Sequence, residues 1–146
     1  MNAKRVKFWK NWLLDINYFI LIIGLVIAFS GDTKLFEFYN ERIEWSFFGG
    51  KPLSEETLQL KKWLFGIIGG TIVGYHTLMI YLIKNAFATR QRWVWEGITI
   101  SLLSWFIIDS TLSIYFGAYF NVIVINLFAL ITIGIPLLIT KKAFTN

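Results

Sequence analysis

Two carboxylic acids, Glu96 and Asp109, lie within an apolar stretch, residues 93–121, that is long enough to cross a lipid bilayer. A charged side chain in hydrocarbon costs several kcal/mol unless it is paired, protonated or facing water, so each acid is a functional hypothesis. A helix would place them about 20 Å apart along its axis and about 140° apart around it. They therefore cannot act together as a pair of catalytic carboxylates.

Asp109 has hydrogen-bonding neighbours but no basic residue within reach on its own helix. These neighbours are Ser110, Thr111 and Ser113, then Asn121 and Asn126 on the next apolar run, with Tyr115 and Tyr119 above them. In one interpretation, Asp109 is hydrogen-bonded to Asn121 or Asn126 and holds two helices together. In the other, the group forms a polar pocket beneath an aromatic loop, open to a small ligand or a lipid headgroup.

A second polar group lies toward the opposite side of the membrane. Asp15, His76 and Glu96 are about 7, 12 and 6 Å from the nearest flanking basic residue by helix rise. They could meet as a site in which a histidine and a carboxylate exchange a proton. Alternatively, each is explained locally. The helix N-terminus then favours Asp15, Glu96 pairs with Arg92 four residues earlier, and the histidine is a neutral packing residue.

Several chemistries are disfavoured by the residues that the sequence lacks. It has one histidine and no cysteine, which argues against a metal cluster and against a Cys/His nucleophile. The glycine-rich segment GIIGGTIVG lacks the Lys and Ser/Thr of a phosphate-binding loop, and no lysine lies in the middle of an apolar run to form a retinal Schiff base. We therefore expect no metal and no cofactor.

The composition is that of an integral membrane protein. Hydrophobic residues make up 56% of the 146 residues, aromatic residues 18%, and the mean hydropathy is +0.60. The basic residues behind the net charge of +5 cluster at the ends of apolar runs, so we expect lipid contact and no nucleic acid binding. The sequence predicts an all-α four-helix bundle as a single domain, 1–146. Its predicted spans are about 12–30, 63–83, 93–112 and 122–140.

The charges predict the topology of this bundle. Nine of the fourteen basic residues flank the spans on the side of the two termini, whereas six of the nine acids fall in the segment 31–62. Both termini are therefore expected in the cytoplasm and the segment 31–62 outside, as one long loop between the first two helices. Its many aromatic residues predict that it lies on the membrane surface or covers the outer mouth of the bundle. Ser54, followed by two glutamates, predicts that the second helix begins there.

Glycines in the second span predict how the helices pack. Gly66, Gly70 and Gly74 recur at intervals of four and therefore share one helix face. Small residues at this spacing allow another backbone to approach closely, which is how helices associate in lipid. The sequence therefore predicts a packing stripe, broadened by Gly69.

Three segments resemble a group of small, uncharacterised four-span bacterial membrane proteins. They are WLFGIIGGTIVGYHTLMIYLIKNAF, RQRWVWEGITISLLSWFIIDSTLSIYFGAYFNVIVINLF and GIPLLITKKAF. The group shares a glycine-rich second span, a Trp-rich start to the third span and an Asp near its end, and the likeness covers about the last 85 residues. It implies a bacterial inner-membrane location and no particular activity. The architecture alone is also similar to that of the sterol isomerase and sigma-2 receptor superfamily.

Three function classes stay open at this point. The first is a non-enzymatic bundle that binds a lipid, a hydrophobic ligand or a partner membrane protein as an accessory subunit. The second is a small membrane enzyme of the isomerase type that uses His76 with Glu96 or Asp109. The third is a channel or transporter, which would need a homo-oligomer to form a pore from so few spans. The glycine stripe, the aromatic loop and the lack of a catalytic set favour the first.

Overall fold

The computed structural model describes residues 2–31 and 33–144, which form helices and no strand. In chain order the elements are α1 (Ala3–Ser30), η1 (Lys34–Phe36), α2 (Glu37–Phe48), α3 (Glu55–Asn85), η2 (Phe87–Thr89), α4 (Arg92–Tyr115), α5 (Tyr119–Asn121), a π-helical turn η3 (Val122–Asn126), α6 (Leu127–Thr140) and η4 (Lys141–Ala143). The last four elements form one continuous apolar helix, Tyr119–Ala143, which we call the fourth helix.

Four helices are long and apolar enough to cross a membrane: α1, α3, α4 and the fourth helix. The predicted all-helical class and the four apolar helices are therefore confirmed. The helices extend beyond the predicted spans, since α3 has 31 residues and is about 46 Å long at 1.5 Å per residue. This length exceeds the hydrocarbon thickness of a bilayer, which is about 30 Å.

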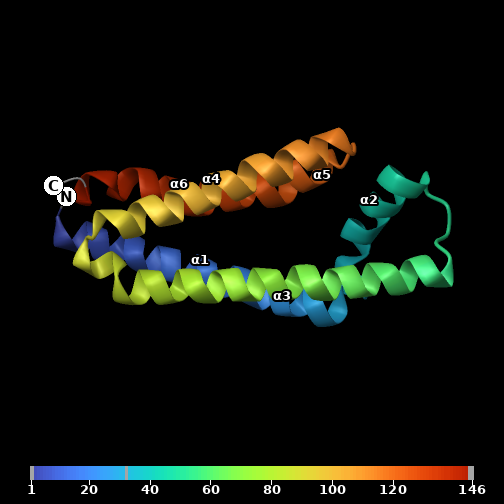
Figure 1. Ribbon diagram of the computed structural model, residues 1–146, viewed down its shortest axis with the longest axis horizontal. Helices are drawn as coiled ribbons and strands as arrows, with labels where there is room; N and C mark the ends of the chain where they lie inside the picture. Colours follow the sequence, from blue (N-terminus) through green and yellow to red (C-terminus); the bar gives the residue numbers. More distant parts are fainter. Residues whose placement is uncertain (1, 32, 145–146) are drawn as a thin grey trace.

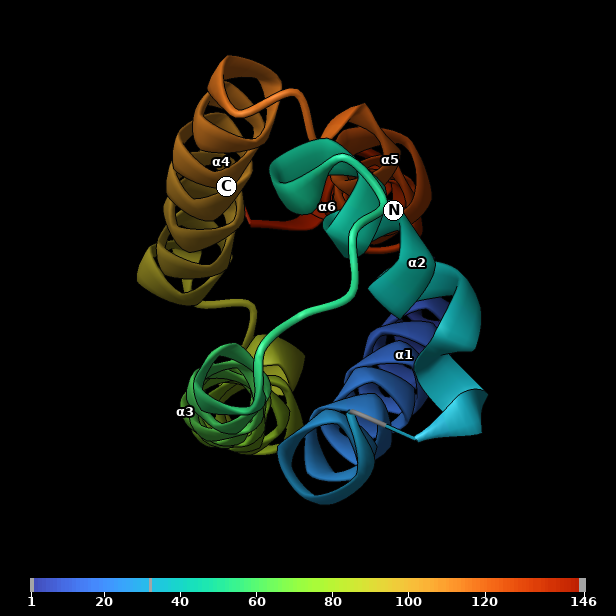
Figure 2. The same cartoon turned by 90° about the vertical axis from the view of Figure 1, so that its right-hand side faces the viewer.

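Figure 1 shows that the two termini lie at the same end of the bundle, where the link between α3 and α4 also turns. We call this the terminal end, and the opposite end, which carries α2, the loop end. Viewed along the bundle, α1 and α3 form one side while α4 and α6 form the other (Figure 2).

The segment predicted as a long loop, 31–62, is largely helical. It contains α2 and the first two turns of α3, joined by a short link. α2 ends at Phe48 and is followed by Gly49 and Gly50. Their φ values of +62° and +73° are ones that glycine adopts without strain. α3 begins after Ser54, whose hydroxyl accepts a hydrogen bond from the backbone N–H of Thr57 at 3.3 Å, as the sequence predicted.

Two glycines form the closest contact between α1 and α3. A Cβ atom added to Gly69 would lie 2.5 Å from both the backbone nitrogen of Ala28 and the carbonyl oxygen of Gly24. A Cβ added to Gly24 would lie 2.7 Å from the side chain of Ile72. Backbone meets backbone here because neither glycine carries a side chain.

The predicted packing stripe is therefore displaced within this chain. An added Cβ would meet nothing within 4 Å at Gly70 or Gly74, and at Gly66 only a carbonyl oxygen 3.9 Å away. Gly69, predicted only to broaden the stripe, makes the contact instead, because one residue along a helix turns the side-chain direction by about 100°. Within the chain, the contact with α1 therefore uses the face of Gly69, and the face of Gly70 and Gly74 has no close neighbour among the described residues.

Indole side chains tie α1 and α4 to α6 near the terminal end. Pro136 has no N–H, so the carbonyl of Thr132, four residues earlier, loses its helical partner. Trp12 Nε1 on α1 donates to that carbonyl at 2.9 Å. Trp95 Nε1 on α4 similarly donates to the carbonyl of Leu137 at 2.8 Å.

The buried apolar core also lies toward the terminal end. Its fully buried members come from all four long helices and the two links that follow α3 and α6: Leu13, Met79, Ile83, Phe87, Val94, Ile98, Leu102, Ile133, Leu137 and Phe144. The loop end contributes none of them. It is held instead by hydrogen bonds and ring contacts, and these form the candidate site.

Candidate functional site

Asp109 is the centre of a hydrogen-bonded cluster at the loop end of α4. Its Oδ1 accepts hydrogen bonds from Asn121 Nδ2 and Asn126 Nδ2, each at 2.7 Å, and from Ser113 Oγ at 3.2 Å. Asn121 Nδ2 also donates to Ser113 Oγ at 2.9 Å. The predicted hydrogen bonds from Asp109 to the two asparagines are thus both present, and they join α4 to the fourth helix.

A π-helical turn brings the two asparagines to the same side of the fourth helix. In an α-helix, Asn121 and Asn126 would point about 140° apart, because each residue turns the helix by about 100°. Over Val122–Asn126 the backbone instead forms the wider i→i+5 pattern, in which Leu127 N–H bonds to the carbonyl of Val122. Residues five apart then lie nearly above one another, so both amides reach one carboxylate.

Asn126 occupies the deepest position in this cluster and is completely buried. Its Nδ2 also donates to Ser110 Oγ at 3.0 Å, whereas its Oδ1 is buried without a hydrogen-bond partner. Buried polar atoms are normally paired, so this oxygen is an unused acceptor. The second carboxylate oxygen of Asp109, Oδ2, also accepts no hydrogen bond from a described residue, although Asp109 is only partly buried.

α2 covers the cluster through one of its faces. Tyr39 donates its hydroxyl hydrogen bond to Asn121 Oδ1 at 3.2 Å, which links α2 to the fourth helix. Burial, and secondarily the negative charge of Asp109, raise the pKa of the Tyr39 phenol above its ordinary value of 10.0. The phenol therefore keeps its proton at neutral pH and stays a donor.

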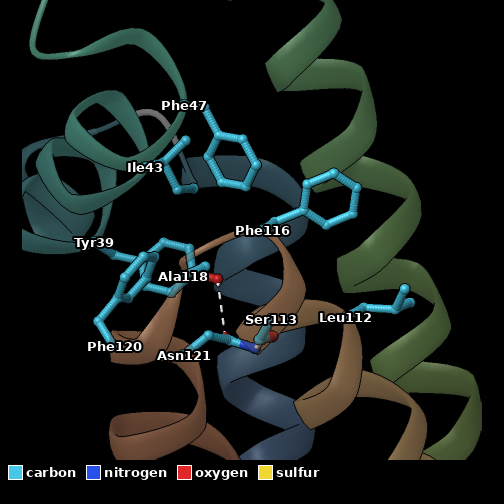
Figure 3. Close-up of a pocket in the computed structure, with 9 residues that line it drawn as sticks. All are labelled: Tyr39, Ile43, Phe47, Leu112, Ser113, Phe116, Ala118, Phe120 and Asn121. Carbon is cyan, nitrogen blue, oxygen red and sulfur yellow. Dashed lines mark hydrogen bonds between the residues drawn. The ribbon is translucent and has the colours of Figure 1, made fainter.

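A cleft of about 220 Å³ opens between α2 and the loop end of α4 and the fourth helix (Figure 3). Most of its lining is apolar or aromatic: Tyr39, Ile43, Phe47, Leu112, Phe116, Ala118 and Phe120. Its two remaining lining residues, Ser113 and Asn121, are members of the Asp109 cluster. Figure 3 shows these two side chains on the opposite side of the cleft from the rings of Phe47 and Phe116. The cleft thus has an aromatic wall and a polar base.

Two of the aromatic residues that cover the cleft are each one position later in the sequence than predicted. Tyr115 and Tyr119, expected above Asp109, are 80% and 59% exposed and do not line the cleft. Their neighbours Phe116 and Phe120 line it instead. In a helix, neighbouring side chains point about 100° apart. Sequence spacing alone does not show which of two neighbouring aromatic residues at a helix end points toward the cleft.

His76 belongs to a separate buried contact between α1 and α3. Its Nδ1 lies 2.7 Å from Asn17 Oδ1, and Asn17 Nδ2 donates to the carbonyl of Leu13 at 2.7 Å. A carbonyl cannot donate, so the Leu13 contact fixes which amide atom of Asn17 faces the histidine. Nδ1 of His76 must therefore carry the hydrogen, and Nε2 is left as the acceptor.

The predicted inner group does not assemble. Asp15 is exposed on α1 and has no hydrogen bond or ion pair to another described residue. Glu96 accepts from Arg92 Nε at 2.6 Å, one turn earlier on α4. His76 bonds to an asparagine, so none of these three predicted site residues contacts another. In residues 2–31 and 33–144, no group of three or more His, Cys, Asp or Glu side chains could hold a metal ion.

Comparisons of the chain with the models of known protein families, with curated proteins and with solved structures found no match.

Proposed function

We propose that this protein is a multi-pass membrane protein that binds one end of a lipid or of another amphipathic molecule in the cleft beneath α2. The observation that carries the proposal is the junction of an aromatic wall with the Asp109 cluster. Binding sites for small molecules combine such apolar walls with a few converging polar groups. In this proposal the protein acts as a binding protein, without catalysis.

The size and position of the cleft support a partly inserted ligand. Small-molecule pockets commonly measure about 300–1,000 Å³, whereas this cleft holds about 220 Å³. It is large enough for a headgroup and too small for a whole lipid. The chains of a bound lipid would lie outside the cleft, along the exposed apolar side chains of the helices, which include Ile108, Ile114 and Ile123.

The proposed topology places the loop end outside the cell. Nine of the fourteen basic residues flank the spans on the side of the termini, and six of the nine acids fall in 31–62. This asymmetry supports both termini in the cytoplasm. The resemblance to small bacterial membrane proteins supports the inner membrane. The cleft would then lie near the headgroups of the outer leaflet.

A matched pair of serine variants on α4 tests the binding proposal. Ser113 lines the cleft, whereas Ser104 is exposed and points about 180° away, because nine residues turn a helix by about 900°. Ser113→Phe should fill the cleft, and Ser104→Phe should leave it open. Both variants would be purified at full length in detergent and incubated with dioleoyl phosphatidylethanolamine and dioleoyl phosphatidylglycerol.

Native mass spectrometry would then count the lipids that each protein retains. The original chain and Ser104→Phe should retain at least one lipid more than Ser113→Phe at the same concentration. Circular dichroism would verify that both variants keep their helix content. Equal lipid retention by the two variants, with both folded, would overturn the proposed binding site. If Ser113→Phe unfolds, Ala118→Leu, which narrows the same cleft without removing a hydrogen bond, replaces it.

A further inference from the structure

The donors at the base of the cleft are already used within the cluster. Asp109 as a carboxylate only accepts, and all three of its hydrogen bonds fall on Oδ1. Its Oδ2 and the buried Oδ1 of Asn126 have no donor among the described residues. The donors nearby, including Tyr39 and Asn121, already point at other oxygens. A ligand that completes this cluster must therefore bring donors of its own.

The charge of the cluster is also uncompensated. No basic side chain lines the cleft, and none among the described residues forms an ion pair with Asp109. Two basic residues of the covering region have other partners: Lys61 pairs with Glu44 at 3.6 Å, and Arg42 lies over the ring of Phe38 at 5.1 Å. Neutral donors hydrogen-bond to a carboxylate without cancelling its charge, whereas a cation does both. An anionic group would be repelled.

The aromatic wall suits the same kind of ligand. Tyr39, Phe47, Phe116 and Phe120 all line the cleft, in two ring pairs whose centroids are 5.2 and 6.0 Å apart. Aromatic ring faces attract cations, above all lysine-like and quaternary ammonium groups. Asp109 does not itself line the cleft, but it is hydrogen-bonded to the two polar lining residues, Ser113 and Asn121. The aromatic wall and the carboxylate behind the polar base thus favour the same chemical class.

We propose that the cleft recognises an ammonium group at the end of an apolar molecule. This inference rests on the proposed function and names the ligand class. The ammonium would lie between the aromatic rings and the Asp109 cluster, with Ser113 and Asn121 beside it. Two sources carry this chemistry: the headgroup of a zwitterionic lipid such as phosphatidylethanolamine, and a free long-chain amine.

Paired probes of equal chain length test the ligand class. Decylamine is cationic at neutral pH, and decanol differs from it only at the head. Binding to the purified full-length protein in a non-ionic detergent would be measured by titration calorimetry. We expect decylamine to bind at least about tenfold more tightly than decanol, a difference of about 1.4 kcal/mol. Dioleoyl phosphatidylethanolamine and phosphatidylglycerol form the second pair, and separate a lipid source from a free amine.

Two matched pairs of variants locate the effect. Asp109→Asn should reduce the preference for the amine to less than about twofold, whereas Asp15→Asn, at an exposed acid on α1, should leave it unchanged. Phe47→Ala should weaken amine binding severalfold, whereas Phe48→Ala, at the next residue and outside the cleft lining, should not. The phenylalanine pair keeps the test decisive if Asp109→Asn does not fold.

The outcomes separate this inference from the proposed function. A preference for either the amine or phosphatidylethanolamine that depends on Asp109 and Phe47 supports the inference and identifies the source. Equal binding of cationic and neutral probes, abolished by Ser113→Phe, would overturn the ammonium inference and leave the binding site in place. Binding of no probe and no lipid would overturn both.

Discussion

The contact between α1 and α3 makes a sharp prediction about two neighbouring glycines. Gly69 faces the backbone of α1, and Gly70 faces open space. Replacing either glycine with alanine adds one methyl group to the interior of α3. We expect Gly69→Ala to be less stable than Gly70→Ala, and Gly70→Ala to be as stable as the original chain or slightly more stable.

The magnitude follows from the distances. The new Cβ at Gly69 would lie 2.5 Å from two backbone atoms of α1, whereas ordinary contacts begin at 3.4 Å. The backbones must part by about 1 Å locally, and a gap of that size forfeits a quarter to a half of each dispersion contact along the seam. Overpacking of this kind costs about 1–3 kcal/mol. Alanine improves helix propensity by up to about 1 kcal/mol at either site, and this gain cancels between the two variants. They should therefore differ by the overpacking cost alone, about 1–3 kcal/mol.

Unfolding of the two variants in one detergent, followed by circular dichroism, measures this difference directly. Gly24→Ala adds a third point. Its Cβ would lie 2.7 Å from Cγ2 and 3.0 Å from Cβ of Ile72, and 3.2 Å from the carbonyl oxygen of Gly69. These distances are longer than the two 2.5 Å backbone distances at Gly69, and a side-chain methyl yields more easily than a backbone atom. We therefore expect a loss between those of the other two. If Gly69→Ala proves as stable as Gly70→Ala, then α1 and α3 do not approach each other as described, and the reasoning fails.

Three further predictions concern single hydrogen bonds. Trp12→Phe should lower the unfolding free energy by about 0.5–1.5 kcal/mol, because it removes the hydrogen bond to the carbonyl of Thr132. The loss should be smaller in a Pro136→Ala background, because the alanine supplies a backbone N–H to that carbonyl. A double-mutant cycle in which the two effects simply add would contradict this. Because the pKa of Tyr39 is raised from 10.0 by burial, the stability from its protonated phenol is complete below pH 10 and falls as the pH rises through the raised pKa. Tyr39→Phe should flatten this alkaline fall in a melting profile, and an unchanged profile would refute the link. His76→Ala orphans the amide oxygen of Asn17 and should cost about 1–3 kcal/mol, while nitrogen NMR of the unaltered ring should show hydrogen on Nδ1 rather than Nε2.

Much of the helical architecture follows from the sequence. Apolar run length predicts the four long helices, because the backbone of a spanning segment must satisfy its own hydrogen bonds. The start of α3 follows from Ser54 and the two glutamates after it, because these residues stabilise free N–H groups at a helix N-terminus. These signals depend only on residues close together in the sequence, so they can be recognised without knowing how the helices pack.

The candidate site was only partly predictable. The types and order of Asp109, Asn121 and Asn126 predict a hydrogen-bonded group, yet in a regular helix the two asparagines would diverge. The π-helical turn that makes them converge has no sequence signature here, since residues 122–126 are ordinary apolar residues ending in an asparagine. The π-helical turn goes with a contact between two helices, in which the amides of Asn121 and Asn126 both hydrogen-bond to the carboxylate of Asp109.

The role of α2 had a signal that could have been found. Tyr39, Ile43 and Phe47 are four residues apart, so a helix places them on one face, which is the face that lines the cleft. Because the segment is predicted to be a loop, this helical periodicity does not enter the prediction.

The predicted group of Asp15, His76 and Glu96 did not form for a different reason. Depth along a helix puts His76 near Glu96, but direction around the helix decides contact, and that direction depends on which helices are neighbours.

The two ends of the bundle are stabilised by different forces, and this division has a functional consequence. Apolar packing gathers at the terminal end, where Phe87 and Phe144 are fully buried against each other. The loop end depends on individual hydrogen bonds, such as Tyr39 to Asn121 and Asn40 Nδ2 to the carbonyl of Gly31. Regions with few buried apolar contacts open at lower free energy than a packed core. Under the proposed function, a ligand entering beneath α2 would have to displace only a few hydrogen bonds, while the helices beneath it stay fixed by the core at the far end.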